Sequence, residues 1–430
     1  MSQAINTLFV ALSGPFGWAA SAVVLVGTVL LVIAMARSAA LRSWKWRGLA
    51  LVTGLAGAGV LLVPFALNAS RVPSPPGPET VQRASIQLPV PGEDGRMIGM
   101  DLWFPAHGAA VTGEELAGCA GVPGLPLAVN EGEAVPLLLY MPHFRGERND
   151  SPSRFAALAS QGYVVVTFDD IAHDPPDPAA SAPEEAARQH EWPYGAEAEY
   201  DRTVALNAIR AELGARKALA VLDSLSACAA SAPQSPWSMA VDYARVGHIG
   251  YSFGGASAAE AALLDPRIAA VASLDGSLYG RAASELFAAP YLYLRRGEPL
   301  PTQGDLTTGP MQERMDARFF VRDLGQQVTL AARPGSGAYR IAGTDHGSFS
   351  EALLTPSASS QWLLNDPVAS FDAINAYLLD FFDMHLRGTE PRLIGQPTAD
   401  RPNVASLAEL GLVPGADFGL PADPGMADQD

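Results

Sequence analysis

The sequence predicts an α/β fold, a mostly parallel sheet with helices on both faces, preceded by two N-terminal transmembrane helices. From about residue 83 to residue 392, short apolar runs alternate with helical patterns, which is the rhythm of strand–helix–strand units. Ahead of them, Phe16 to Met35 and Gly48 to Ser70 carry no charged side chain, and each is long enough to cross a bilayer as a helix.

The first 71 residues are predicted to be a membrane anchor, followed by a proline-rich linker over residues 72–82. The loop between the two apolar stretches holds basic residues and tryptophans, at Arg37, Arg42, Trp44, Lys45, Trp46 and Arg47. Such a loop is typical of the cytoplasmic face, which puts everything after residue 71 on the periplasmic or extracellular side. The alternative is that residues 45–69 are a cleaved signal peptide, and the main domain is exported in that case too.

The charge is divided unevenly along the chain. Residues 1–75 carry five basic groups and no acidic one, which leaves 23 basic and 45 acidic groups in the remainder. An acidic domain is repelled by phosphate backbones, so a nucleic-acid partner is not expected. The two cysteines, Cys119 and Cys228, lack the spacing of a metal site. They can form one disulfide bridge or stay unpaired, and the sequence leaves both possibilities open.

One large domain is predicted over residues 83–392, with a Pro-, Asp- and Ala-rich tail over residues 393–430. A hairpin opens this domain, strands and helices then alternate, and a long helix closes it. The predicted strands are Arg83–Leu88, Gly99–Phe104, Val135–Met141, Tyr163–Phe168, Arg245–Gly250, Ile268–Leu274, Pro290–Leu294 and Tyr339–Ile341, and the predicted helices are Ser153–Gln161, Arg202–Ser226 and Phe371–Arg387. Two insertions, at residues 173–200 and 297–311, are either lids over an active site or plain surface loops.

A candidate nucleophile lies at a strand–turn–helix junction. The stretch Gly250-Tyr251-Ser252-Phe253-Gly254-Gly255 follows an apolar strand and precedes an alanine-rich helix. A serine at the tip of such a strained turn needs neighbours without side chains, which the glycines provide. A serine hydroxyl is a weak nucleophile at neutral pH, so it also requires a base and an acid that orients the base.

The base and the acid are expected downstream of Ser252, in the order serine, acid, histidine. His346 lies in a loop after a strand and is the better base, whereas His385 lies near the end of the closing helix. Asp275 ends the strand that follows the nucleophile helix, which favours it as the acid. Glu298, one strand further along, is the alternative.

Backbone N–H groups are expected to stabilise the oxyanion of a tetrahedral intermediate. One is the amide of Phe253, the residue after the nucleophile. The second comes from the loop Pro142-His143-Phe144-Arg145-Gly146, and either Phe144 or Arg145 can supply it.

These residues together resemble the α/β-hydrolase superfamily, and within it the family of plasma-type platelet-activating factor acetylhydrolases and related bacterial esterases. The similarity runs from about residue 86 to residue 390 and is carried by the motif around Ser252, by Ser273-Leu274-Asp275-Gly276 and by Gly343-Thr344-Asp345-His346-Gly347-Ser348-Phe349. The resemblance implies Ser252, Asp275 and His346 as the catalytic triad and places the second donor amide at Arg145. The chain departs from the family at Tyr251, where histidine is usual, and at Phe144, where glycine is usual.

The expected function is that of a serine carboxylic-ester hydrolase working through an acyl-enzyme, on a small-molecule ester or lipid such as a short-chain or oxidised phospholipid. No metal or cofactor is expected. The alternatives are a peptidase or polyester hydrolase with the same triad, and a catalytically dead, membrane-tethered binding module. The oligomeric state is left open.

Overall fold

A computed structural model describes residues 73–93, 95–107, 116–129, 134–190, 197–354 and 367–415. They fall into two units. The larger unit comprises the described parts of residues 75–342 and 372–415 and contains the sheet. The smaller unit comprises residues 73–74, 343–354 and 367–371. It holds two short 3₁₀ helices, η5 (His346–Phe349) and η6 (Glu351–Leu354), and the first turn of α13 (Pro367–Phe382).

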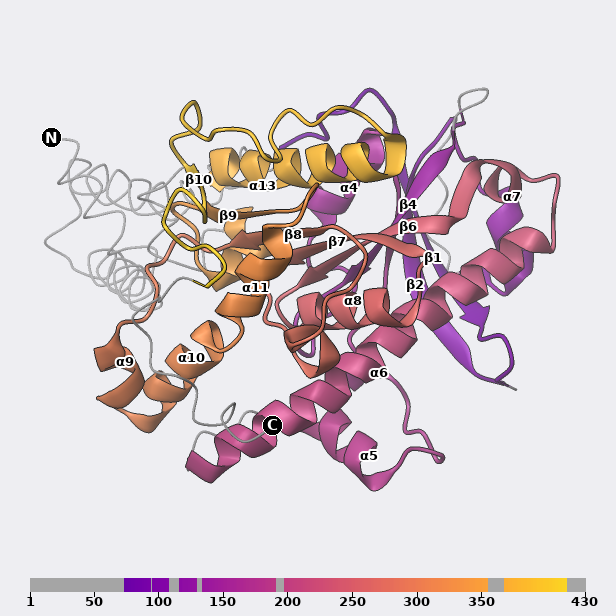
Figure 1. Ribbon diagram of the computed structural model, residues 1–430. Helices are drawn as coiled ribbons and strands as arrows, with labels where there is room; N and C mark the ends of the chain where they lie inside the picture. Colours follow the sequence, from indigo (N-terminus) through magenta and orange to yellow (C-terminus); the bar gives the residue numbers. More distant parts are fainter. Residues whose placement is uncertain are drawn as a thin grey trace, which may run out of the picture. The chain divides into compact units, whose positions relative to one another are not determined.

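The described strands join into one mixed sheet in the order β10-β9-β8-β7-β6-β4-β5-β2-β1-β3 (Figure 1). Neighbouring strands from β5 to β9 are parallel, whereas β1 with β2, β2 with β5, and β9 with β10 are antiparallel. The strands are β1 (Val81–Pro89), β2 (Met97–Pro105), β3 (Leu116–Ala117), β4 (Val135–Met141), β5 (Val164–Thr167), β6 (Val241–Tyr251), β7 (Ile268–Leu274), β8 (Tyr291–Arg295), β9 (Gly337–Ile341) and β10 (Val404–Ser406).

Helices cover both faces of this sheet. In Figure 1, α4 lies on one face of the sheet, and α6 and α8 lie on the other. Every residue of β4 and of β8 is buried, which explains why these strands consist almost entirely of apolar and aromatic residues. The other helices are α4 (Pro152–Ser160), α5 (Ala182–Gln189), α6 (Glu197–Ala230), α7 (Pro236–Ala240), α8 (Phe253–Leu264), α9 (Gln303–Thr307), α10 (Met311–Val321), α11 (Leu324–Ala331), the 3₁₀ helices η2 (Cys119–Gly124), η3 (Ile171–His173) and η4 (Gly280–Ala283), and the π-helical turn η7 (Asp383–Arg387).

The fold-class prediction is corrected at its N-terminal part, the two transmembrane helices. Among the residues that the structure describes, no helix is both long and apolar enough to cross a membrane. The 34-residue helix α6 has the length, but charged side chains such as Glu212 and Arg216 interrupt it. The two predicted spans, Phe16 to Met35 and Gly48 to Ser70, lie outside the described residues.

Residues 393–415, expected to begin a loosely held tail, are attached to the sheet. Strand β10 pairs with the edge strand β9. The Asp380 carboxylate accepts hydrogen bonds from the backbone N–H groups of Arg392, Leu393 and Ile394 at 2.8–2.9 Å. Backbone pairing therefore fixes a segment whose composition gave no strand signal. Residues 416–430 lie outside the described part of the chain.

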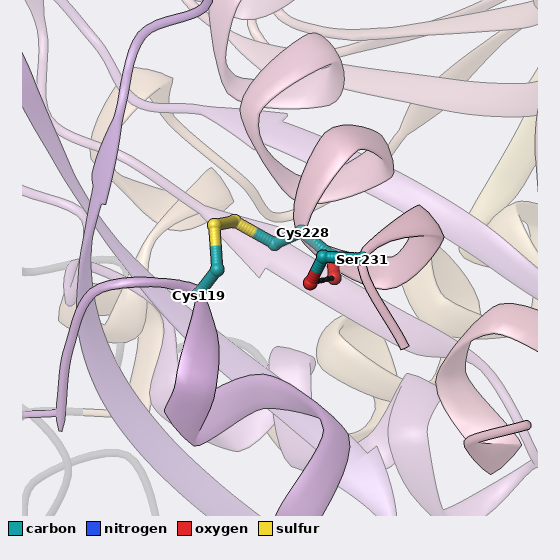
Figure 2. The surroundings of a disulfide bond; sticks show 3 residues. All are labelled: Cys119, Cys228 and Ser231. Atoms are coloured by element: carbon teal, nitrogen blue, oxygen red, sulfur yellow. Dashed lines mark hydrogen bonds between the residues drawn. A yellow bond between two sulfur atoms is a disulfide. The ribbon is translucent and has the colours of Figure 1, made fainter. Parts of the chain in front are cut away.

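A disulfide bond answers the question that the sequence left open. Cys119 at the start of η2 is bonded to Cys228 near the end of α6, across a sequence separation of 109 residues (Figure 2). The hydroxyl of Ser231 donates to the Cys228 carbonyl at 2.7 Å, as Figure 2 also shows. The bridge ties the segment after the hairpin of β1 and β2 to helix α6.

Removal of this bridge should destabilise the domain, because a cross-link that closes a long loop restricts the unfolded chain. The double variant Cys119→Ser/Cys228→Ser is expected to lose about 2–4 kcal/mol of unfolding free energy. Urea unfolding followed by far-UV circular dichroism measures this, with non-reduced wild type as the reference. Equal unfolding midpoints for wild type and the double variant would contradict the expectation.

His248 is a structural residue of β6, as its position in the nucleophile strand predicts. Its side chain is completely buried, in register with Leu139 on β4 and Val271 on β7. Neither ring nitrogen has a hydrogen-bond partner within the described residues. Burial lowers the pKa of His248 to about 3, because the charged imidazolium would lose its hydration without gaining a partner.

This histidine should make the domain sensitive to acid. The unfolded chain binds a proton at this position below about pH 6.5, whereas the folded protein excludes it until the pH approaches 3. His248 therefore lowers the unfolding free energy by about 1.4 kcal/mol for each pH unit that the solution falls within this window. In His248→Leu that contribution is lost, and urea unfolding at pH 7 and at pH 4.5 should show a smaller difference than in wild type.

The control is His107→Gln, at a histidine whose side chain is exposed. This variant should keep the wild-type difference between the two pH values. If His248→Leu keeps it as well, burial of His248 is not a source of the acid sensitivity.

Candidate active site

Ser252 lies in a strained turn between β6 and α8. Its backbone has φ 53° and ψ −118°, a left-handed conformation that a residue with a side chain rarely adopts. The Ser252 N–H donates to the Leu274 carbonyl at 2.9 Å, which fastens the turn to the neighbouring strand β7. The turn presents the serine at the carboxyl end of the parallel strands, as the glycine-flanked motif predicts.

Two glycines allow the turn to close. A Cβ on Gly250 would lie 2.1 Å from the Gly254 carbonyl oxygen, and a Cβ on Gly254 would lie 2.2 Å from the Met141 carbonyl oxygen. Both distances are far below a normal contact with backbone, so neither position accepts a side chain without movement. The first turn of α8 therefore packs directly on the end of β4.

Asp275 lies beside this turn, directly after β7. Its φ of 48° is also left-handed, and its side chain is only 1% exposed. Tyr251 and Leu274, the residues that precede Ser252 and Asp275, are paired in the sheet. One Asp275 oxygen accepts the backbone N–H of Arg296 at 2.9 Å, and the other lies 3.4 Å from the Arg296 guanidinium. The structure thus brings Ser252 and Asp275 to adjacent strand ends.

The two candidate acids, Asp275 and Glu298, differ in burial. The Glu298 side chain is 44% exposed and lies 3.5 Å from the same Arg296 guanidinium. A carboxylate that orients a histidine works best where water does not compete for it. The surroundings therefore favour Asp275 over Glu298. Arg296, which contacts both carboxylates, was not singled out from the sequence.

His346 belongs to the smaller unit, where it begins η5. Asp345 caps this helix, because its carboxylate accepts the Ser348 N–H at 3.0 Å and the Ser348 hydroxyl at 2.7 Å. Asp345 is thus a loop residue, as expected. His385 belongs to the larger unit and is structural, because its Nε2 donates to the Gly335 carbonyl at 2.7 Å.

The loop after β4, which was predicted to supply an oxyanion donor, is tightly turned. Arg145 has φ 56°, and the Gly146 N–H donates to the His143 carbonyl at 2.7 Å. The Phe144 carbonyl accepts from His143 Nδ1 at 2.9 Å, and the Arg145 carbonyl accepts from His173 Nε2 at 3.0 Å. His143 packs edge-on against Tyr251, with ring centroids 5.4 Å apart, so one departure from the family pattern contacts this loop.

A buried carboxyl lies near this loop. Asp150 accepts the Tyr140 hydroxyl at 2.7 Å. Burial raises the pKa of Asp150 to about 6, although the Tyr140 hydrogen bond and the charge of His143 act against the shift.

A buried ion pair behind the loop was missed in the sequence. Arg210 of α6 and Asp170, which caps η3, are both completely buried and bonded to each other. Burial lowers the pKa of Arg210, and the Asp170 carboxylate opposes that shift. The residues one helical turn away from Arg210, Asn207 and Gly214, gave no signal of this pair in the sequence.

The first predicted insertion packs on α6 over its described part. Helix α5 begins with a capping box at Ser181, and Arg210 donates to the carbonyls of Ala187 and Arg188 at the end of that helix. Residues 191–196 lie outside the described part. The second insertion contains α9, capped by Thr302.

Among the described residues, no cluster of His, Cys, Asp and Glu side chains could hold a metal ion.

Comparison with known proteins agrees with the resemblance to α/β-hydrolase esterases. No family model matches the chain. A probable 1-alkyl-2-acetylglycerophosphocholine esterase of Arthroderma benhamiae is 29% identical over an alignment 174 residues long, which covers 38% of this chain and 44% of that protein's length.

In structure, the chain is similar to a ferulic acid esterase from Streptomyces cinnamoneus, with a TM-score of 0.52 over 78% of this chain and 98% of that one. The sequences are 19% identical, so this likeness shows the fold alone. Both similar proteins are named as esterases, which is consistent with the resemblance to α/β-hydrolase esterases in the sequence.

The close packing of α8 on β4 yields a stability prediction. Gly254→Ala would push a methyl group into the backbone of β4, so the unfolding free energy should fall by about 1–3 kcal/mol. The matched control is Gly325→Ala in α11, where nothing lies within 4 Å of the added carbon. That variant should be as stable as wild type or up to about 1 kcal/mol more stable. Urea unfolding compares them, and equal stability of the two variants would contradict the account.

Proposed function

We propose that the chain is a serine carboxylic-ester hydrolase in which Ser252 is the nucleophile, His346 the general base and Asp275 the acid that orients it. The observation that carries the proposal is the left-handed Ser252 turn beside the buried carboxylate of Asp275. Strain at a polar residue is retained where function needs that residue exposed in one geometry. The similarity to two esterases supports the same conclusion.

In the first half of the reaction, His346 takes the proton of the Ser252 hydroxyl while the oxygen attacks the ester carbonyl carbon. The resulting oxyanion accepts hydrogen bonds from the backbone N–H groups of Phe253 and Arg145. When the intermediate collapses, the carbon–oxygen bond to the alcohol breaks, and the alcohol leaves with the proton from the imidazolium.

In the second half, water replaces the alcohol. His346 takes a proton from water, the hydroxide oxygen attacks the acyl carbon, and the bond to Ser252 breaks as the serine regains a proton. The carboxylic acid then departs. The sequence of steps needs no metal or cofactor.

The proposed substrates are short-chain or oxidised acyl esters of phospholipids. The name of the Arthroderma benhamiae relative, an acetylglycerophosphocholine esterase, supports this class.

A domain that contains a disulfide fits an oxidising compartment, which supports a location on the periplasmic or extracellular side. The excess of acidic residues does not suit a nucleic-acid partner.

The decisive experiment combines Ser252→Ala with covalent labelling. Purified protein is treated with a fluorophosphonate probe, and mass spectrometry identifies the modified residue. Wild type should be labelled at Ser252, and Ser252→Ala should lose labelling and at least about a thousandfold in kcat on p-nitrophenyl butyrate. The control is Ser257→Ala on the same helix, a buried serine that should leave both signals intact.

The same assay separates the two acids and the other functions. Asp275→Asn should lower kcat at least a hundredfold, whereas Glu298→Gln should stay within about threefold of wild type. An unlabelled wild type would contradict the proposal and indicate a binding module without activity. Labelling at Ser252 together with cleavage of peptides or polyesters, and none of short acyl esters, would contradict the substrate class.

A further inference from the structure

Phe144 replaces a glycine in the loop that is expected to supply an oxyanion donor, so its ring requires support. That support is Arg210, whose guanidinium carbon lies 4.2 Å from the centroid of the Phe144 ring. The same guanidinium lies 5.5 Å from the ring of Phe253, and the two rings meet edge to face at 6.4 Å. One buried cation thus contacts the residue before Arg145 and the residue after Ser252.

The position of Phe144 affects the orientation of the donor, the backbone N–H of Arg145. The peptide bond between Phe144 and Arg145 contains the Arg145 N–H, and its trans, planar geometry makes that N–H point opposite to the Phe144 carbonyl. His143 Nδ1 donates to this carbonyl at 2.9 Å. The orientation of the Arg145 N–H is therefore fixed by the carbonyl on one side and by the position of the Phe144 ring on the other.

Arg210 also reaches the far end of the same loop. It is bonded to the Asp170 carboxylate, and the backbone N–H of Asp170 donates to the Gly146 carbonyl at 3.0 Å. The other terminal nitrogen of the guanidinium, Nη1, donates to the carbonyls of Ala187 and Arg188 at 3.1 and 3.0 Å. Arg210 therefore contacts the loop at its middle residue, Phe144, and through Asp170 at its last residue, Gly146.

We propose that Arg210 is a positioning residue for the oxyanion hole. Through its contacts with Phe144, Phe253 and Asp170, Arg210 holds the backbone amides of Arg145 and Phe253 in the relative position that an oxyanion requires. The proposal rests on the proposed function. A donor stabilises an oxyanion only when it lies about 2.7–3.1 Å from that oxygen, so a small movement of the loop is costly. Loss of Arg210 should therefore affect the transition state more than substrate binding.

The test compares a ligand that forms an oxyanion with one that does not. A trifluoromethyl ketone with a short alkyl chain adds to the serine and places an oxyanion in the hole, whereas the matching methyl ketone reports on ground-state binding. In Arg210→Lys, kcat on p-nitrophenyl butyrate and affinity for the trifluoromethyl ketone should each fall at least about tenfold. KM and affinity for the methyl ketone should change less than threefold.

Two further variants guard against misfolding and non-specific effects. Arg210→Met combined with Asp170→Asn removes both buried charges together, and it should fold and show the same loss as Arg210→Lys. Arg216→Met, on the same helix with a side chain 57% exposed, should behave as wild type. Circular dichroism and urea midpoints confirm folding of each protein before the kinetics are read.

The outcomes are distinguishable. The proposal is overturned if both folded Arg210 variants keep wild-type affinity for the trifluoromethyl ketone, or if their loss lies entirely in KM. Wild type that binds the trifluoromethyl ketone no better than the methyl ketone would overturn the proposed function and this inference together. A selective loss of trifluoromethyl ketone affinity in both Arg210 variants supports the inference.

Discussion

The site depends on one constraint, the left-handed backbone at Ser252. A residue with a side chain in this conformation costs about 1–3 kcal/mol, so surrounding packing must hold it there. The hydrogen bond to the Leu274 carbonyl and the side-chain-free surfaces of Gly250 and Gly254 do so. Parallel pairing of β6 with β7 then brings Asp275 to the neighbouring strand end. Sheet register and local strain together assemble this part of the site.

The sequence was most informative where a residue type has one physical use. Glycines on both sides of a serine, after an apolar strand, predicted the turn at Ser252, and the structure has it there. The strand before Asp275 was predicted with its observed bounds, because a mostly apolar run between polar turns suits a strand covered on both faces. The choice between Asp275 and Glu298 needed the structure, since it depends on burial.

Features that depend on contacts between distant segments were out of reach. The ion pair of Arg210 and Asp170 joins residues 40 positions apart, and the sequence near either residue gives no signal of it. The disulfide spans a longer separation still. Strand β10 forms because β9 offers an unpaired edge, although its own residues resemble a loop. The two predicted membrane helices lie outside the described residues, and no helix among the described residues is both long and apolar enough to cross a membrane.

The two anchored residues of helix α6 limit which insertions and deletions this chain can tolerate during evolution. The helix is anchored by Cys228 near one end and by Arg210 about 27 Å earlier along its axis, at 1.5 Å per residue. Each residue of an α-helix advances by about 100°, so a single insertion between these anchors would rotate one of them away from its partner. The exposed positions between the two anchors can hold any residue that suits a helix, but the number of residues between the anchors cannot change.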